Sequence, residues 1–134
     1  MKTTQTNQNC CNNQPAACKC SSAPTLLFPC SGGSDVGALT DLAARQLTSS
    51  GFAKMYCLAG IGGRVSGILA STKAADRIVA IDGCPLNCAK ASLEQAGFTN
   101  LLHLNFTESG LPKGQSPVTI ERITQVVNDV QKLL

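Results

Sequence analysis

The sequence has little aromatic and little charged character. Tryptophan is absent, tyrosine occurs once, and aromatic residues make up 4% and charged residues 14% of the 134 residues. The formal net charge of +3 comes from basic residues spread along the chain, so neither phosphate contacts nor base stacking is favoured and we expect no nucleic-acid partner. No apolar run approaches the roughly 18 residues that span a bilayer, and we expect no membrane partner. Met1 to Asn13 is polar and lacks the apolar stretch of a secretory signal, which favours a cytoplasmic protein.

Cysteine is the residue type that is present in excess, with eight copies. A chain of this length buries roughly two-thirds of the surface that its unfolded form exposes, so it can build a core without disulfides. In a reducing cytoplasm, clustered cysteines serve metal binding or redox chemistry more often than structural bridges. The cysteines are therefore the first candidates for a functional site.

The composition divides the chain into two parts. Residues 1–24 are rich in Asn, Gln, Ser and Thr and show no apolar periodicity, which predicts a flexible arm. This arm carries four of the cysteines: Cys10, Cys11, Cys18 and Cys20. Residues 25–134 alternate short apolar runs with helical patterns, and we interpret them as a single α/β metal-binding domain.

The order of predicted elements defines the fold class. Short apolar runs that end in turns predict strands over 25–28, 52–58, 77–82 and 101–106, and helical spacing predicts helices over 35–50, 65–75, 84–96 and from 119 onward. Such an order predicts an open, mostly parallel four-stranded sheet with helices on both faces, a Rossmann-like or flavodoxin-like layer. The nearly continuous apolar run of 77–82 is typical of a strand buried on both faces.

Four cysteines fall at equivalent places on this predicted sheet. Cys30, Cys57 and Cys84 lie at or just past the ends of the first three strands, and Cys88 follows Cys84 by four residues. Pro85 is suited to the first position of a helix, so we expect Cys84 and Cys88 to share one helical face. Because the carboxyl ends of parallel strands meet at one edge, four thiolates should converge there. Such a set suits a tetrahedral zinc ion or an iron–sulfur cluster.

Simpler interpretations apply to the individual residues. A single cysteine at a strand end is usually a small buried hydrophobe, and this is the preferred interpretation of Cys57 taken alone. The glycines after Cys57 allow a tight turn whose N–H groups can stabilise the sulfur. Nucleotide binding is the minor alternative for this loop, because Val65 stands where a dinucleotide fingerprint requires glycine.

The remaining polar candidates have structural explanations. Asp35 and Asp82 precede helices and are expected to cap them, although Asp82 can also serve as an acceptor or oxygen ligand beside the cysteines. Arg64 and Lys90 can balance thiolate charge, but surface exposure is the default for both. His103, the single histidine, alternates with leucines and should lie on the opposite side of its strand. No carboxylate partner for it is visible in the sequence, so we assign it no catalytic role.

The motifs around the four cysteines carry a family resemblance. Ile81 to Cys88 (IDGCPLNC), Pro29 to Gly32 (PCSG) and Cys57 to Gly63 (CLAGIGG) resemble the DGC-domain family of zinc-binding bacterial and archaeal proteins, named for its Asp-Gly-Cys motif. The resemblance runs from about Cys18 to the last helix. It implies a metal site formed by Cys30, Cys57, Cys84 and Cys88, in agreement with their placement, and it implies no particular reaction.

Three functional hypotheses follow. In the first, the domain holds one zinc ion through the four cysteines; four thiolates close the coordination sphere and leave no position for an activated water, which argues against an enzyme. In the second, the site is an iron–sulfur or dithiol centre that exchanges electrons with a protein partner. In the third, the cysteines of the arm exchange metal with the core site, and the protein traffics metal to a partner.

Overall fold

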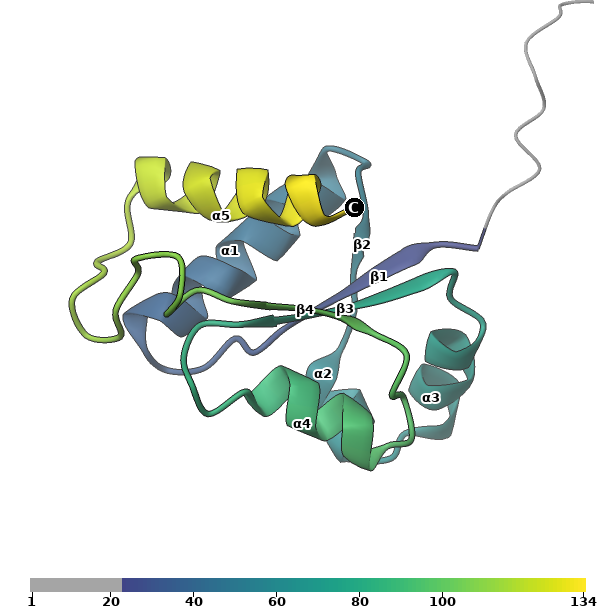
Figure 1. The fold of residues 1–134 in the computed structure, drawn as a ribbon. Coiled ribbons are helices and arrows are strands. Elements are labelled where there is room, and N and C mark those ends of the chain that lie inside the picture. Colours follow the sequence, from purple (N-terminus) through teal and green to yellow (C-terminus); the bar gives the residue numbers. More distant parts are fainter. Residues whose placement is uncertain (1–22) are drawn as a thin grey trace, which may run out of the picture.

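The computed structural model describes residues 23–134, so the predicted arm and Cys10, Cys11, Cys18 and Cys20 lie outside the described residues. The sheet has four parallel strands in the order β2-β1-β3-β4 (Figure 1). These are β1 Thr25–Pro29, β2 Lys54–Met55, β3 Arg77–Asp82 and β4 Leu102–Asn105. The predicted open parallel α/β class is therefore confirmed.

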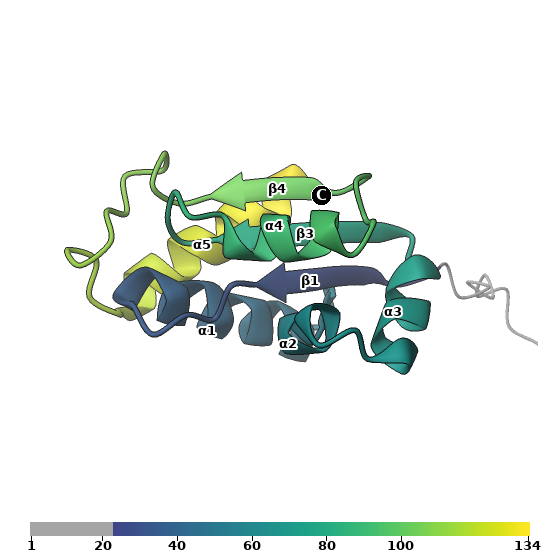
Figure 2. The same cartoon turned by 90° about the horizontal axis from the view of Figure 1, so that it is seen from below.

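Five helices cover the two faces of the sheet. They are α1 Asp35–Ser49, α2 Leu58–Gly62, α3 Ser66–Lys73, α4 Cys88–Gln95 and α5 Ile120–Leu133. Helices α1 and α5 lie side by side on one face, and α2, α3 and α4 lie on the other (Figures 1 and 2). No helix within residues 23–134 combines the length and the apolarity that crossing a bilayer takes.

Each face of the sheet has its own hydrophobic core, because side chains alternate along a strand. On the central strand β1, Leu27 packs toward α1 and α5, whereas Leu26 and Phe28 pack toward α2 and α4. All three side chains are buried. The strands β1 and β3 thus show burial on both faces, as the apolar run of 77–82 predicts for β3.

The space at the carboxyl ends of the two central strands is closed by glycine contacts. In this strand order the chain turns away in opposite directions between β1 and β3, which is where ligands usually bind in open α/β sheets. Here a Cβ on Gly83 would lie 2.8 Å from the carbonyl carbon of Val36, and a Cβ on Gly37 would overlap the backbone of Gly32. The start of α1 therefore packs directly against the connection after β3, and open space is left instead beside β2.

The last helix brings the chain back to the amino ends of the strands. Helix α5 runs back along the sheet, and Nη1 of Arg77, the first residue of β3, donates to the carbonyl oxygen of Leu134 at 2.7 Å. The last described residue thus lies near the amino ends of the strands, where β1 also begins (Figure 2).

The second predicted strand and the turn after it differ from the prediction. The second strand is confined to Lys54–Met55, because Cys57 already caps a short helix. Glycines 60 and 62 accordingly lie in α2 and not in an open turn. The last helix begins after Thr119 as predicted, but Ile120 is exposed, and the buried face of α5 is formed by Val126, Val127 and Val130.

Candidate functional site

The four predicted cysteines lie on three successive connections that leave the carboxyl ends of β1, β2 and β3. Cys30 directly follows β1, Cys57 is the N-cap of α2, Cys84 lies in the β3–α4 connection, and Cys88 is the first residue of α4. All four are free thiols. Cys30 and Cys84 are partly buried, whereas Cys57 and Cys88 are exposed. The prediction that Cys57 taken alone is a buried hydrophobe is therefore wrong.

Cys84 and Cys88 do not share a helical face. Helix α4 begins at Cys88, so the predicted start of this helix at residue 84 is wrong. The N–H of Asn87 donates to the carbonyl of Cys84 at 3.2 Å and closes a turn, and Asn87 adopts a left-handed backbone with φ of 51°. A residue with left-handed φ cannot continue a right-handed helix, so Pro85 occupies a turn instead of the first helical position.

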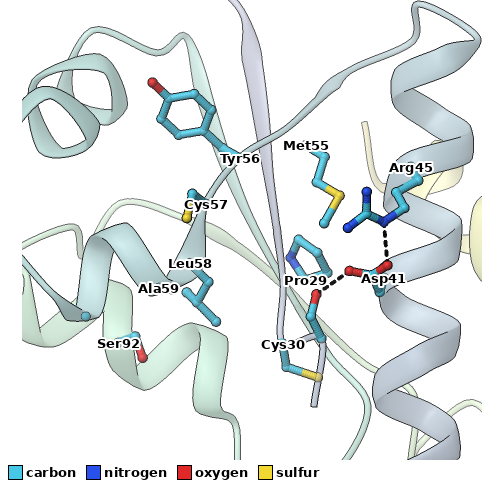
Figure 3. A pocket seen from close by; sticks show the side chains of 12 residues that line it. Pro29, Cys30, Asp41, Arg45, Met55, Tyr56, Cys57, Leu58, Ala59 and Ser92 are labelled. Atoms are coloured by element: carbon cyan, nitrogen blue, oxygen red, sulfur yellow. Dashed lines mark hydrogen bonds and ion pairs between the residues drawn. The ribbon is translucent and has the colours of Figure 1, made fainter. Parts of the chain in front are cut away.

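Cys30 and Cys57 line a common hollow of about 510 Å³ between the ends of β1 and β2 (Figure 3). The Sγ of Cys30 lies 3.5 Å from Oγ1 of Thr40. Because the hydroxyl of Thr40 already donates to the carbonyl of Gly37 at 2.8 Å, the thiol of Cys30 is the donor in this contact. Cys57 is placed differently, since its sulfur accepts the N–H of Gly60 at 3.4 Å. The glycine-rich segment thus donates a hydrogen bond to this sulfur, and its expected support of a metal-bound sulfur stays a prediction.

A charged network forms one wall of this hollow. Oγ of Ser31 donates to Oδ1 of Asp41 at 2.8 Å, and Nε of Arg45 donates to Oδ2 at 2.6 Å (Figure 3). The hydrogen bond from Arg45 holds the pKa of the Asp41 carboxyl below its usual value. Ser31, directly after Cys30, has a left-handed backbone with φ of 47°, and its hydrogen bond to Asp41 holds it in place. The spacing of Asp41 and Arg45, four residues apart on α1, is the sequence signal for this pair.

A second hollow of about 690 Å³ adjoins the first and shares Arg45, Met55, Tyr56 and Cys57 with it. Nζ of Lys54 lies 5.8 Å from the centre of the Tyr56 ring, a cation–π contact. Cys57 therefore stands where two neighbouring hollows meet, beside the edge strand of the sheet.

The four thiols are not drawn into one cluster. Within residues 23–134, no three His, Cys, Asp or Glu side chains are grouped closely enough to hold a metal ion. The fold thus brings Cys30 and Cys57 to one hollow, while Cys84 and Cys88 belong to the next connection along the sheet edge.

Asp82 and His103 form a pair that the sequence does not reveal. Asp82 is 1% exposed, and it accepts the N–H groups of Ala89 at 2.8 Å and Lys90 at 3.1 Å, so it caps α4 as expected. Its Oδ2 also lies 3.0 Å from Nε2 of His103. As predicted, His103 lies on the other face of β4 from Leu102 and Leu104, which pack on the α1 side. On that other face its carboxylate partner is Asp82. Only the β3–β4 register, which pairs Ala80 with His103, brings the two together.

Asp35 connects α1 to the long connection that follows β4. The N-cap of α1 is Ser34, whose side chain accepts the N–H of Gly37, and not Asp35 as expected. Asp35 contributes to the start of this helix by accepting the N–H of Val36. Its carboxylate also accepts the N–H groups of Gly114 at 2.8 Å and Ser116 at 2.7 Å. These hydrogen bonds, the one from Gly114 first, hold the pKa of Asp35 below its ordinary value.

Arg64 and Lys90 are surface residues, as expected. Arg64 is exposed, and its Nη2 donates to the carbonyl of Gln95 at 2.9 Å, which links the end of α2 to the end of α4. Lys90 forms an exposed ion pair with Glu94 at 3.9 Å. Neither residue contacts a cysteine sulfur through a hydrogen bond in the described part of the chain.

The fold and the site define a small α/β protein with free thiols on three successive strand-to-helix connections. The sequence model of the DGC domain matches residues 26–130, and the chain belongs to this family. The resemblance seen in the cysteine motifs is thereby confirmed. The chain is also similar to the anaerobic and virulence modulator AnvM of Pseudomonas aeruginosa, with 39% identity over 88 residues that cover 66% of this chain and 67% of the relative. No solved structure matches the chain.

Proposed function

We propose that the protein binds one zinc ion through the thiolates of Cys30, Cys57, Cys84 and Cys88. The observation that carries this proposal is the presence of four free thiols on three successive connections at one edge of the sheet. Thiolates are the ligands that structural zinc sites prefer, and four of them complete a tetrahedral sphere. Zinc bound in this way would supply a fixed link between the connections and no position for a reacting water.

The four thiols are suitable ligands for zinc, but they lie too far apart to bind one ion unless the connections that carry them move. Because no three donors are grouped in the described residues, Cys30 and Cys57, which line one hollow, have to approach Cys84 and Cys88 on the β3–α4 turn. Free energy of metal binding commonly drives such ordering in small metal-binding domains. We therefore expect zinc to reduce the mobility of the β2–α2 connection, which carries the exposed Cys57, as well as to bind.

Native mass spectrometry of protein purified without oxygen tests this proposal. We expect one zinc ion per chain in the wild type and none after Cys30→Ser or Cys84→Ser. Ser92→Ala is the matched control, since Ser92 lines the same hollow but offers no thiol, and it should keep its zinc. Full zinc content in both cysteine variants would overturn the assignment.

A dithiol redox centre is the second candidate, and one observation favours it. Cys30 and Cys57 line the same hollow, and Cys57 is exposed there. We expect a redox buffer of graded potential to remove two thiols reversibly and to give a Cys30–Cys57 disulfide in peptide maps. An unchanged thiol count over the whole range would eliminate this candidate. An iron–sulfur centre is distinguished from a zinc site and from a dithiol by its colour. Thiolate-bound iron clusters absorb near roughly 400 nm, whereas zinc thiolates and free thiols are colourless.

The name of the Pseudomonas relative, anaerobic and virulence modulator, supports a regulatory task more than a catalytic one. Exposed thiolates oxidise readily, so a thiol site could make such modulation depend on oxygen. We expect hydrogen peroxide to release zinc from the wild-type protein and a reductant to restore binding. Zinc that stays bound after peroxide treatment would contradict an oxidant-sensitive role.

A further inference from the structure

The β3–α4 turn that carries Cys84 and Cys88 is held from outside by the edge strand β4. His103 and Asn105 are two residues apart on β4, so both side chains lie on the face that α4 covers. The register sets Asn105 beside Asp82, the last residue of β3. The two polar side chains therefore stand directly against the start of the thiol-bearing connection.

Asn105 binds the turn at two points. Its Nδ2 donates to the carbonyl of Cys84 at 2.8 Å and to Oδ1 of Asn87 at 2.7 Å. Its own Oδ1 accepts the N–H of Thr107 at 2.9 Å, so all of its hydrogen-bonding groups are engaged. The side chain of Asn87 is thereby used for this contact and makes no capping bond to α4.

His103 acts on the other side of the turn through Asp82. With Nε2 as the protonated ring nitrogen, His103 donates to Oδ2 of Asp82 at 3.0 Å. The same carboxylate receives the N–H groups of Ala89 and Lys90, directly after Cys88. The backbone on both sides of the turn is thus fixed by two side chains of one neighbouring strand.

We propose that Asn105 and His103 are positioning residues that set the geometry of Cys84 and Cys88. This inference rests on the proposed thiol function of these two cysteines. Cys84 is partly buried against the core that α1 and α5 cover, but neither its sulfur nor that of Cys88 makes a hydrogen bond within residues 23–134. Both thiols are therefore held in place and remain free to bind a metal ion or another ligand.

The test compares Asn105→Asp with Asn100→Asp. Asp at position 105 has the shape of Asn and can still accept from Thr107, but it cannot donate to Cys84 or Asn87. Asn100 is exposed, and its substitution makes the same change of charge. We expect Asn105→Asp to weaken zinc binding roughly 10- to 100-fold, the usual effect of losing a group that orients a metal ligand, and Asn100→Asp to leave it unchanged.

His103 offers a test by rescue. Gln at position 103 can still place an N–H near Asp82, whereas Leu cannot. We expect His103→Leu to weaken zinc binding and His103→Gln to restore most of it. Thermal unfolding of each variant identifies any that lose the fold as a whole. If the His103 variants do so, the comparison of Asn105→Asp with Asn100→Asp still tests the inference.

Alkylation of the metal-free reduced protein separates this inference from the zinc proposal. Peptide mapping gives the labelling rate of each cysteine in one molecule, and Cys30 is the internal reference. We expect Asn105→Asp to raise the rate at Cys84 relative to Cys30 roughly fivefold, in line with the loss of the one hydrogen bond that Asn105 donates to the carbonyl of Cys84 itself. If the wild type binds no zinc, the proposed function fails, and this ratio still tests the positioning. Unchanged zinc affinity and an unchanged labelling ratio would overturn the inference.

Discussion

Nε2 of His103 on β4 lies 3.0 Å from Oδ2 of Asp82 at the end of β3, and the carboxylate is 1% exposed. A buried carboxylate is tolerated only when donors surround it. Asp82 has three, from His103 and from the N–H groups of Ala89 and Lys90. This residue therefore joins β3, α4 and β4, and only Gly83 separates it from Cys84, the first cysteine of the turn.

Replacing Asp82 with Ala should destabilise the protein by about 2 to 3 kcal/mol, the combined cost of a lost helix cap and of buried groups left without a partner. Urea unfolding gives this free energy. Asp76→Ala is the control, because the side chain of Asp76 is 57% exposed and forms only a surface ion pair with Arg77, and its effect should stay within about 0.5 kcal/mol. A similar small effect of Asp82→Ala would show that Asp82 is not a joint of the fold.

Gly83→Ala should also destabilise the fold, by about 1 to 3 kcal/mol, because the new Cβ would meet the backbone of Val36 at 2.8 Å. The strain falls between α1 and the cysteine turn, so labelling of Cys84 should also change. Gly67→Ala is the matched control. A Cβ there meets nothing within 4 Å, and Ala inside helix α3 should raise stability by up to about 1 kcal/mol. Equal effects at both positions would argue against the close contact.

Asp35 should make the connection after β4 sensitive to acid. Its pKa is lowered from an ordinary value of 3.8, chiefly by hydrogen bonds from Gly114 and Ser116. A lowered pKa means that the contribution to stability is fully present above 3.8 and is lost as the pH falls through the lower value of the folded state. Amide hydrogen exchange, corrected for its intrinsic dependence on pH, should show weaker protection of Gly114 and Ser116 in this acid range.

The variant Asp35→Asn should show the same weakening at neutral pH. The control is Glu108→Gln, an exposed substitution in the same connection that also removes one negative charge. Protection of both amides that is equal in Asp35→Asn and in the wild type would contradict the role of this carboxylate.

Thr48 should protect the edge of the sheet. Its hydroxyl donates to the carbonyl of Ala44 at 2.8 Å and accepts the N–H of Met55 at 2.7 Å, in the two-residue edge strand β2. Thr48→Val keeps the shape but leaves this N–H without its partner, so we expect a loss of about 1 kcal/mol and faster exchange of the Met55 amide. Ser49→Ala, on the exposed side of the same turn, should change neither quantity. Unchanged exchange at Met55 in Thr48→Val would refute the protection.

Local signals explain why most of the fold is predictable. Apolar runs mark β1 and β3, because both strands are buried on two faces, and Ser34 and Thr119 cap α1 and α5 as their residue types suggest. The cysteine placement then follows from topology alone, since parallel strands present their carboxyl ends at one edge. The order of strands and helices along the sequence is therefore enough to predict that the four thiols lie on three successive connections at the carboxyl ends of the strands.

Long-range contacts explain what is not predictable. Pro85 is a sound local signal for a helix start, but Asn105 and Asp82 select a turn with a left-handed Asn87 and delay α4 to Cys88. Asn105 is 18 residues away from Asn87 in the sequence, so no local pattern reveals this contact. The His103–Asp82 pair has the same cause, because only the strand register reveals it.

The placement of Leu134 has a practical consequence. β1 begins at the amino ends of the strands, and Leu134 lies there too (Figure 2). Cys30, Cys57, Cys84 and Cys88 follow the opposite, carboxyl ends of the strands. A protein molecule anchored to a sensor surface through its last residue would therefore present its thiols to the solution. Immobilised protein would suit real-time measurement of metal or partner binding, and a fluorescent label coupled near residue 134 would stand away from the sulfur atoms.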